Sequence, residues 1–403
     1  MHKSLSTTGV IDLGNPGTYM QYIVDAGFDS MMLDLGMFYT EYDLESYGVQ
    51  RSIVNGKRLH EYFSLFLEQG RIHSICFEAV RTPRMRWDTK RNDLNDLMQQ
   101  IGEQSIRVCK ELDCRLIIIQ PLFSGIARYD RWDKNFEYYL KIGRLAKENN
   151  ICVLLENQCE NINGHLVRGM CADSGTAAGL IDVLNHELGS ESFGFCLNTE
   201  VCSLCGQDMA EMTVALGKRL KAVLVKECDD AYNVGRMPCI GGGNRKWFGL
   251  IQGLRRIAYD GLFIMDAGSA IRGFSHLLRS QLYPMIKSVS DFFCWQIEME
   301  HQLKKYPTRV LFGAGKMCQN YVKYYGGAYP PLFVCDNNPR LWGTRVCGLD
   351  IKSPEVLRKL SEDCQVIICN VFYEEIAEQL EDMGVRNIGT FNDEYMVESV
   401  DYR

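Results

Sequence analysis

The sequence predicts an α/β protein in which a closed parallel (β/α)8 barrel is followed by a small parallel α/β domain. Three observations lead there. The chain has 403 residues, too many for one typical domain of about 100–200 residues. Short apolar runs alternate with helix-length segments up to about residue 300, which is typical of βαβ units. A second and shorter alternation of the same kind begins after Pro307.

The barrel is predicted from eight candidate strands, at residues 4–8, 30–34, 72–77, 115–120, 151–156, 192–198, 221–226 and 261–266. Helix-length segments lie between them, for example at 93–112, 132–149 and 177–187. About eight units in this length fit a closed barrel better than an open sheet. An open doubly wound sheet is the alternative that the pattern leaves.

A long helix is predicted at 286–306, because Pro307 then removes a backbone donor and ends the helical pattern. Four further strands are predicted at 309–312, 331–336, 365–370 and 387–390. The expected organisation is therefore a barrel at 1–285, a connecting helix at 286–306 and a second domain at 307–403.

Composition restricts the class of protein. The net charge of −7 argues against a nucleic-acid partner, because binding a phosphate backbone needs a basic surface. No signal-peptide pattern opens the sequence and no apolar run reaches 18 residues, so no membrane association is expected. The odd count of 17 cysteines suits reduced thiols in a cytoplasmic protein. A homo-oligomer is compatible with all of this and is left open.

Polar residues stand where the predicted barrel strands end. In a parallel α/β barrel the chemistry lies at the carboxyl ends of the strands. Those ends carry Asp34, Gln120, Glu156, Asn198, Lys226 with Glu227, and Asp266. Several polar groups converging on one mouth predict a functional site there.

Around these residues the sequence resembles the xylose isomerase-like barrel family of sugar isomerases, epimerases and endonucleases. The resemblance covers about residues 1–285 and rests on the segments at 153–157, 194–199, 220–227, 235–243 and 259–266. It implies a small-molecule sugar or sugar phosphate as substrate. It also implies that two carboxylates move a proton between carbons, and we expect Glu156 and Asp266 in that role, with Asn198 binding substrate.

The resemblance further implies a divalent metal held by Glu, Asp, His and Glu at four strand ends. Glu156 matches the first ligand and Asp266 the last, whereas Asn198 stands where an Asp is expected and Leu224 where the His is expected. A slip of the alignment would make Glu227 or Cys228 the substitute for the His. A metal held by Glu156, Asp266 and Asn198 would be Mg²⁺ or Mn²⁺ rather than Zn²⁺, because no histidine contributes.

A metal-free site is the second hypothesis. Side chains alternate along a strand, so if Leu224 faces the barrel interior, Lys226 does too. We expect the Lys226 ammonium between Glu156 and Asp266, where it would replace the charge of the metal. Arg236, His73, His165 and Glu227 are further candidates for substrate contacts, since each is predicted near the barrel mouth.

The second domain carries a glycine turn between a strand and a helix, with Gly313 and Gly315, and Asp336 ends the next strand. Glycines bring backbone N–H groups close to a phosphate at a helix N-terminus, and the acid can accept from ribose hydroxyls. Residues 307–395 resemble a small Rossmann-like module of sugar-modifying enzymes, which implies a nucleotide or nucleotide-sugar ligand. A purely structural or dimerising module is the alternative.

The leading interpretation is therefore a sugar isomerase or epimerase. A non-catalytic carbohydrate- or nucleotide-sugar-binding or regulatory protein on a degenerate barrel is the alternative from another class. A third hypothesis is a lyase that uses Lys226 as a Schiff base.

Overall fold

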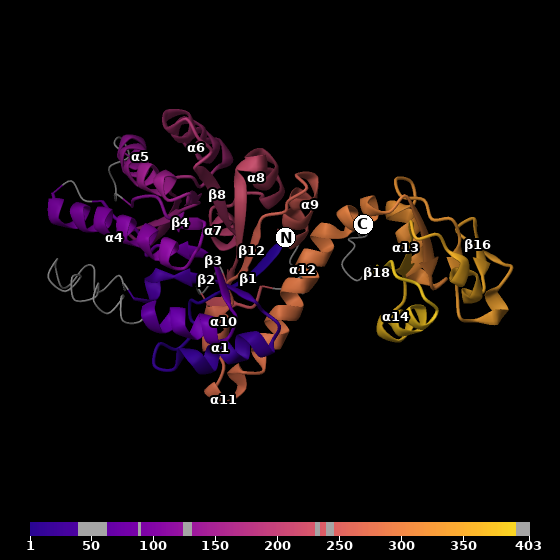
Figure 1. Cartoon of the computed structure of the whole chain (residues 1–403). Helices are drawn as coiled ribbons and strands as arrows, with labels where there is room; N and C mark the ends of the chain where they lie inside the picture. The colour runs from indigo at the N-terminus through magenta and orange to yellow at the C-terminus, as the bar shows by residue number, and fades with distance from the viewer. Residues whose placement is uncertain (39–62, 88–89, 124–130, 230–233, 239–245, 392–403) are drawn as a thin grey trace. The chain divides into compact units, whose positions relative to one another are not determined.

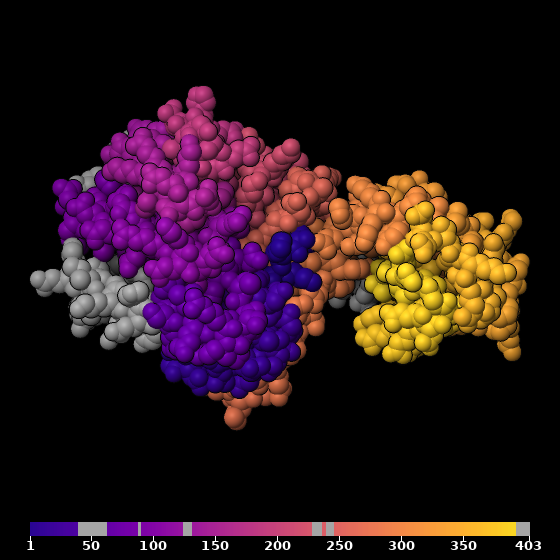
Figure 2. All heavy atoms as spheres, in the orientation of Figure 1, coloured from indigo at the N-terminus to yellow at the C-terminus, as the bar shows by residue number. Residues whose placement is uncertain are grey.

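The computed structural model describes residues 1–38, 63–87, 90–123, 131–229, 234–238 and 246–391. The chain divides into two compact units, Met1–Ile297 and Glu298–Arg403, each of which packs as a body of its own (Figure 2). The division falls within helix α12 (Leu282–Lys305). Among the helices of the described ranges, none combines the length and the apolar character that a bilayer crossing requires.

The first unit is the predicted closed barrel of eight parallel strands. Each strand pairs with its neighbour in the chain, and β12 closes the circle against β1. The strands are β1 (His2–Ser6), β2 (Ser30–Asp34), β3 (Cys76–Arg81), β4 (Leu116–Ile119), β5 (Cys152–Glu156), β8 (Phe193–Asn198), β9 (Leu220–Val225) and β12 (Leu262–Met265).

Helices follow the strands and surround the barrel (Figure 1). They are α1 (Pro16–Asp25), α4 (Asn92–Glu111), α5 (Arg131–Glu148), α6 (Ser174–Leu188), α7 (Thr199–Leu204), α8 (Met209–Leu216), α9 (Lys246–Arg256), α10 (Gly268–Arg272) and α11 (His276–Arg279), with α12 at the end. The local sequence sets their ends. In α6, for example, the Asp173 carboxylate accepts from Thr176 N, and Gly189 ends the helix at φ +58°.

Two antiparallel hairpins extend from the strand ends. One joins β6 (Cys159–Ile162) to β7 (His165–Arg168), and the other joins β10 (Glu227–Asp229) to β11 (Val234–Arg236). The first turns through Asn163 and Gly164, which both have positive φ, as a two-residue type I′ turn requires. Residues 239–243 of the predicted glycine-rich segment lie outside the described ranges.

The third strand corrects a prediction. The sequence placed it at 72–77, but β3 runs from Cys76 to Arg81. Ile72 made the earlier segment resemble a strand, yet its side chain is 62% exposed and lies before a turn. The buried residues Ala79 and Val80 belong to the true strand. The shift places Arg81, which the sequence analysis did not single out, at the carboxyl end of β3.

The barrel interior explains which side chains reach the mouth. A buried apolar cluster fills it, formed by Met32, Ala79, Ile118, Leu154, Cys196, Ala222, Leu224, Leu262 and Ile264. Because side chains alternate along a strand, a residue two positions further on faces the same interior, one layer higher. That next layer, called the polar layer below, consists of Asp34, Arg81, Gln120, Glu156, Asn198, Lys226 and Asp266.

The second unit contains a mixed six-stranded sheet rather than the four strands predicted. Its order is β15 (Arg345–Val346), β16 (Leu349–Lys352), β14 (Val334–Cys335), β13 (Thr308–Phe312), β17 (Cys364–Ile368) and β18 (Ile388–Thr390). Helices α13 (Lys316–Tyr325) and α14 (Tyr373–Asp382) accompany it. The sequence missed the hairpin β15–β16 because β15 has only two residues, although its turn, Cys347-Gly348, has positive φ at both positions.

Candidate active site

The Arg81 guanidinium lies at the centre of the polar layer. Its Nε and Nη2 donate to Glu156 Oε2 and Oε1, both at 2.8 Å, and its Nη1 donates to Asp34 Oδ2 at 2.9 Å. The Arg81 side chain is 15% exposed, that of Asp34 5% and that of Glu156 0%. One guanidinium therefore joins strands β2, β3 and β5 through two buried carboxylates.

Burial opposes the charge of Arg81, but Glu156 and Asp34 outweigh it and hold the pKa of Arg81 well above its ordinary value. The bidentate geometry suits this, because a planar guanidinium matches the two oxygens of a carboxylate. Asp34 is fixed from its other sides as well, since it accepts from Thr8 Oγ1 at 2.7 Å and from Gly36 N at 2.7 Å.

Glu156 receives two further hydrogen bonds, both from side-chain amides. Asn198 Nδ2 donates to Glu156 Oε1 at 2.8 Å, and Gln120 Nε2 donates to the same oxygen at 3.3 Å. Arg81, Asn198 and Gln120 thus surround the carboxylate with N–H donors. The arrangement fixes Glu156 in place and leaves none of its surface exposed.

Asn198 has a positioning role that the sequence did not reveal. Its Oδ1 caps helix α7 by accepting from the N–H groups of Glu200 and Val201, and its Nδ2 donates to Glu156. Its backbone is held by the side chain of Asn157, which accepts from Asn198 N and donates to Asn198 O. Both ends of the Asn198 amide are therefore in use. An aspartate at this position could cap the helix but could not donate to Glu156.

A second ion pair, between Lys226 and Glu200, lies at the barrel mouth. Lys226 Nζ lies 2.8 Å from Glu200 Oε2 on α7, and Thr199 Oγ1 fixes the Lys226 backbone by bonding both its N–H and its carbonyl. The predicted position of Lys226 between Glu156 and Asp266 is corrected in part. Arg81 is the cation that contacts Glu156, whereas Lys226 pairs with Glu200 and acts electrostatically on Asp266.

Asp266 and Lys226 influence each other. Burial raises the pKa of Asp266, and the positive charges of Lys226 and Arg81 only partly offset that effect. Burial opposes the charge of Lys226 as well, but Asp266 and Glu200 outweigh it and raise the pKa of Lys226. Asp266 is 2% exposed. It is thus a buried carboxylate that binds a proton more readily than an ordinary aspartate does, beside a lysine that stays charged.

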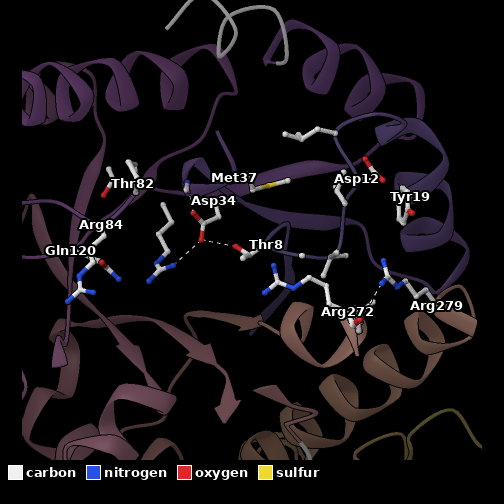
Figure 3. A pocket seen from close by; sticks show the side chains of 18 residues that line it. Thr8, Asp12, Tyr19, Asp34, Met37, Thr82, Arg84, Gln120, Arg272 and Arg279 are labelled. Carbon is white, nitrogen blue, oxygen red and sulfur yellow. Dashed lines mark hydrogen bonds and ion pairs between the residues drawn. The ribbon is translucent and has the colours of Figure 1, made fainter. Parts of the chain in front are cut away.

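A cavity of about 720 Å³ opens next to this network (Figure 3). Thr8, Asp34, Arg81 and Gln120 belong to both the network and the lining of the cavity. Glu156, Lys226 and Asp266 lie in the same polar layer but are not among the residues that line the cavity. The volume is within the range of small-molecule sites, about 300–1,000 Å³.

Four predicted contact residues lie elsewhere. His73 lies in the turn that precedes β3, at the end of the strand opposite the mouth, so its predicted place in the pocket is wrong. His165 is exposed beside the turn of the β6–β7 hairpin, and Arg236 is exposed at the end of β11. Glu227 is buried and pairs with Lys246 at 3.2 Å. None of the four lines the described cavity.

The metal ligands that the resemblance implies do not fit a divalent cation here. Both Glu156 oxygens accept from a guanidinium whose positive charge would repel a metal ion. The Asn198 oxygen faces the N–H groups of α7, and Leu224 is fully buried in the apolar cluster. Within the described ranges, no three His, Cys, Asp or Glu side chains gather as a metal-binding group.

In the second unit, the glycine turn and Asp336 contact each other. Asp336 Oδ2 accepts from Ala314 N at 2.8 Å, and its Oδ1 accepts from Asn338 N at 2.8 Å. Gly313 has φ +102° and packs against Cys369, while a Cβ placed at Gly315 would have no heavy atom within 4 Å beyond Gly315 itself and its chain neighbours. Both oxygens of the carboxylate that was expected to accept from a ribose thus already accept from backbone N–H groups.

Sequence reasoning missed Arg81, Glu200 and Thr8. Arg81 was hidden by the misplaced third strand, and only its position before Pro83 marked a strand end there. Glu200 follows the strand end Asn198 within a sequence typical of a helix start, Asn-Thr-Glu, which could have been found. No local sequence pattern signals that Thr8 contacts Asp34, which is 26 residues away.

Comparison with known proteins supports the barrel fold of the first unit. The model of a family described as "xylose isomerase-like TIM barrel" matches residues 20–274. Comparison of the sequence with curated proteins found no significant match.

Several solved structures share the fold. A D-tagatose 3-epimerase-like protein has a TM-score of 0.55 at 14% identity, covering 75% of this chain and 100% of that one. D-psicose 3-epimerase with D-tagatose from Clostridium cellulolyticum H10 has a TM-score of 0.53 at 12% identity, covering 74% and 99%. The IOLI protein with a bound zinc atom has 0.53 at 10%, covering 74% and 99%. Such identities establish similarity of fold alone.

Asn198→Asp should destabilise the barrel, because it removes the donor to Glu156 Oε1 and adds a buried negative charge beside it. We expect a loss of about 3 kcal/mol in the free energy of unfolding of the barrel, measured by urea denaturation. Asn163→Asp, the same change at an exposed hairpin turn, should cost less than about 0.5 kcal/mol. An Asn198→Asp variant whose free energy of unfolding equals that of the wild type would contradict the positioning role of Asn198.

The purified chain should carry no stoichiometric divalent metal. We expect the melting temperature to be the same in EDTA and in excess Mg²⁺, Mn²⁺ or Zn²⁺, since a ligand that binds only the folded state would raise it. Elemental analysis checks the metal content directly. One tightly bound metal ion per chain would overturn this interpretation of the site.

Proposed function

The chain belongs to the xylose isomerase-like TIM barrel family, and on that premise we propose that it is a sugar isomerase or epimerase that works without a metal. The observation that carries the proposal is the Arg81 guanidinium, held between Asp34 and Glu156 at the edge of the cavity. It supplies a permanent positive charge where a substrate oxygen can reach it.

Arg81 has hydrogen-bond capacity left for a substrate. A guanidinium has five N–H groups, and the contacts to Glu156 and Asp34 use three of them. The remaining two belong to Nη1 and Nη2. Because Arg81 lines the cavity, these groups can donate to the carbonyl oxygen of a sugar.

The chemistry is proton transfer next to that carbonyl. A base removes the proton from the neighbouring carbon, the C–H electron pair forms a C=C bond, and the carbonyl π pair moves onto oxygen. The guanidinium stabilises the resulting negative oxygen. Return of the proton to the former carbonyl carbon isomerises the sugar, provided that the neighbouring hydroxyl gives its proton to the enolate oxygen and becomes the new carbonyl. Delivery of a proton from solvent to the opposite face of the first carbon, with the proton taken by the base passing to solvent, epimerises the sugar.

Asp266 is the base that the electrostatics favours. Its raised pKa makes it a better proton acceptor than an ordinary aspartate, and its charge is coupled to Arg81, Asp34 and Lys226. Lys226 then stabilises the ionised form of Asp266. The raised pKa of Lys226 argues against the Schiff-base hypothesis, because that reaction needs a neutral amine.

Glu156 and Asn198 receive different roles from those first expected. Glu156 anchors Arg81, and Asn198 orients Glu156, so neither needs to touch the substrate. Substrate contacts by Arg236, His165 and Glu227 remain predictions.

A non-catalytic sugar-binding protein is the second candidate function. The observation in its favour is that Glu156, Lys226 and Asp266 are not among the residues lining the described cavity. In that case Thr8, Asp34, Arg81 and Gln120 would bind the hydroxyl groups of a sugar, and no proton would be exchanged.

For the second unit we propose a Rossmann-like module with a nucleotide or nucleotide-sugar ligand. The supporting features are the parallel pairing of β13 with β14 and β17, and the glycine turn that leads from β13 into α13. A cytoplasmic location is also proposed, supported by the cysteines of the described ranges, none of which forms a disulfide.

Asp266→Asn should lower the rate of solvent deuterium incorporation into a ketose substrate by about 10²–10⁴-fold, because the amide cannot accept the proton. Burial disfavours the Asp266 charge, so the variant should melt at no lower temperature than the wild type. Asp260→Asn, an exposed change at the other end of β12, should leave exchange intact. Wild-type protein that exchanges no proton in any of a broad panel of sugars would favour the binding protein.

Lys226→Met should move the acidic limb of kcat/KM to higher pH. Lys226 lowers the pKa of Asp266, so without it the carboxylate stays protonated, and inactive as a base, up to a higher pH. Lys226→Arg should keep the limb near its original position, and Lys221→Met, at the exposed start of β9, should not move it. A limb that stays in place in Lys226→Met would exclude Asp266 as the titrating base.

A further inference from the structure

The lining of the cavity has an excess of positive charge, although the chain as a whole has a net charge of −7. Its described charged residues are Arg81, Arg84, Arg272, Arg279, Asp12 and Asp34. Asp34 and Glu156 pair with Arg81, and their two negative charges exceed its single positive charge. Outside this network the lining carries Arg84, Arg272 and Arg279 and one carboxylate, that of Asp12, which is exposed and accepts from Gly14 N.

Arg272 is the arginine most open to a ligand. It ends α10, the short helix that follows β12, and its side chain is exposed. Within the described part of the chain, no residue forms an ion pair or a side-chain hydrogen bond with its guanidinium. A Cβ at Gly9 would lie 3.2 Å from Arg272 Cζ, so this glycine, at φ +67°, lets the guanidinium lie against the backbone that follows β1.

The neighbouring arginines are held in place. Arg279 donates to the backbone carbonyls of Phe274 and Arg272, at 3.1 and 3.3 Å, and so fixes the segment that carries Arg272. Arg84 stacks over the Phe123 ring at 4.8 Å. Figure 3 shows Arg272 and Arg279 on one side of Thr8 and Asp34, and Arg84 with Gln120 on the other.

We propose that the sugar bound in this cavity carries a carboxylate or phosphate group, which pairs with Arg272 beside Arg279 while the carbonyl end of the sugar faces Arg81. A guanidinium binds either group through two parallel hydrogen bonds. The inference rests on the proposed function and narrows its substrate class to acidic sugars. The two positive regions have different tasks, since Arg81 faces the reacting carbonyl and Arg272 recognises the anionic group.

Calorimetric titration of the full chain with three probes tests the proposal: D-fructose, D-fructose 6-phosphate and D-glucuronate. We expect at least one anionic probe to bind about tenfold or more tightly than D-fructose at low salt, and the preference to weaken as salt is added. The stronger anionic probe distinguishes phosphate from carboxylate recognition. In Arg272→Met the dissociation constant of the anionic probe should rise about 10- to 100-fold, while that of D-fructose should stay unchanged.

Arg107→Met, an equal change of charge at an exposed position on α4, is the matched control and should keep the preference. Equal affinity for the three probes, binding of none of them, or an Arg272→Met variant that retains the preference each overturns the proposal. Deuterium exchange into D-fructose without any anion preference would refute only this inference. An anion preference that depends on Arg272, without exchange in any sugar, would support the inference and refute the isomerase.

Discussion

The buried contact between Arg81 and the carboxylates of Glu156 and Asp34 is the constraint on which the barrel mouth depends. It links three strands through one side chain and places a fixed positive charge above an apolar core. Removing Arg81 would leave two buried carboxylates without their counter-charge, and such a loss typically costs about 3–5 kcal/mol. The surrounding residues fit the need to keep these buried charges paired.

The contact between Arg81 and Glu156 explains the residue types at positions 198 and 224. Glu156 needs donors around it, so the strand end that could hold a second carboxylate has an amide instead. In the proposed metal-free site Arg81 supplies the cation, so β9 needs no metal ligand, and Leu224 packs into the core. A guanidinium does not lose its proton at any physiological pH, so we expect the pH dependence of activity to come from Asp266. Burial raises the pKa of Asp266, and the neighbouring cations lower it.

Much of the barrel could be predicted because its strands are continuous apolar runs separated by helical segments. The strand ends at Asp34, Glu156, Asn198 and Asp266 were found for the same reason. Arg81 was not, because exposed Ile72 made the wrong segment resemble a strand, and a shift of four residues hides which side chain reaches the mouth. The pairing of residue 81 with residue 156 is a long-range contact without a local signal. The hairpin turns at Asn163-Gly164 and Cys347-Gly348 did carry a glycine signal, but their strands are too short to show a pattern.

A double-mutant cycle on the Arg81–Glu156 pair tests the central claim most directly. Arg81→Met, Glu156→Leu and the double variant are compared by urea denaturation of the barrel, with the exposed pair Arg219–Asp182 as reference. We expect each single change to cost about 3–5 kcal/mol and the double change much less than their sum, with a coupling of about 3 kcal/mol. The exposed pair should couple by about 1 kcal/mol or less. Costs at Arg81 and Glu156 that add within about 0.5 kcal/mol would contradict the claim.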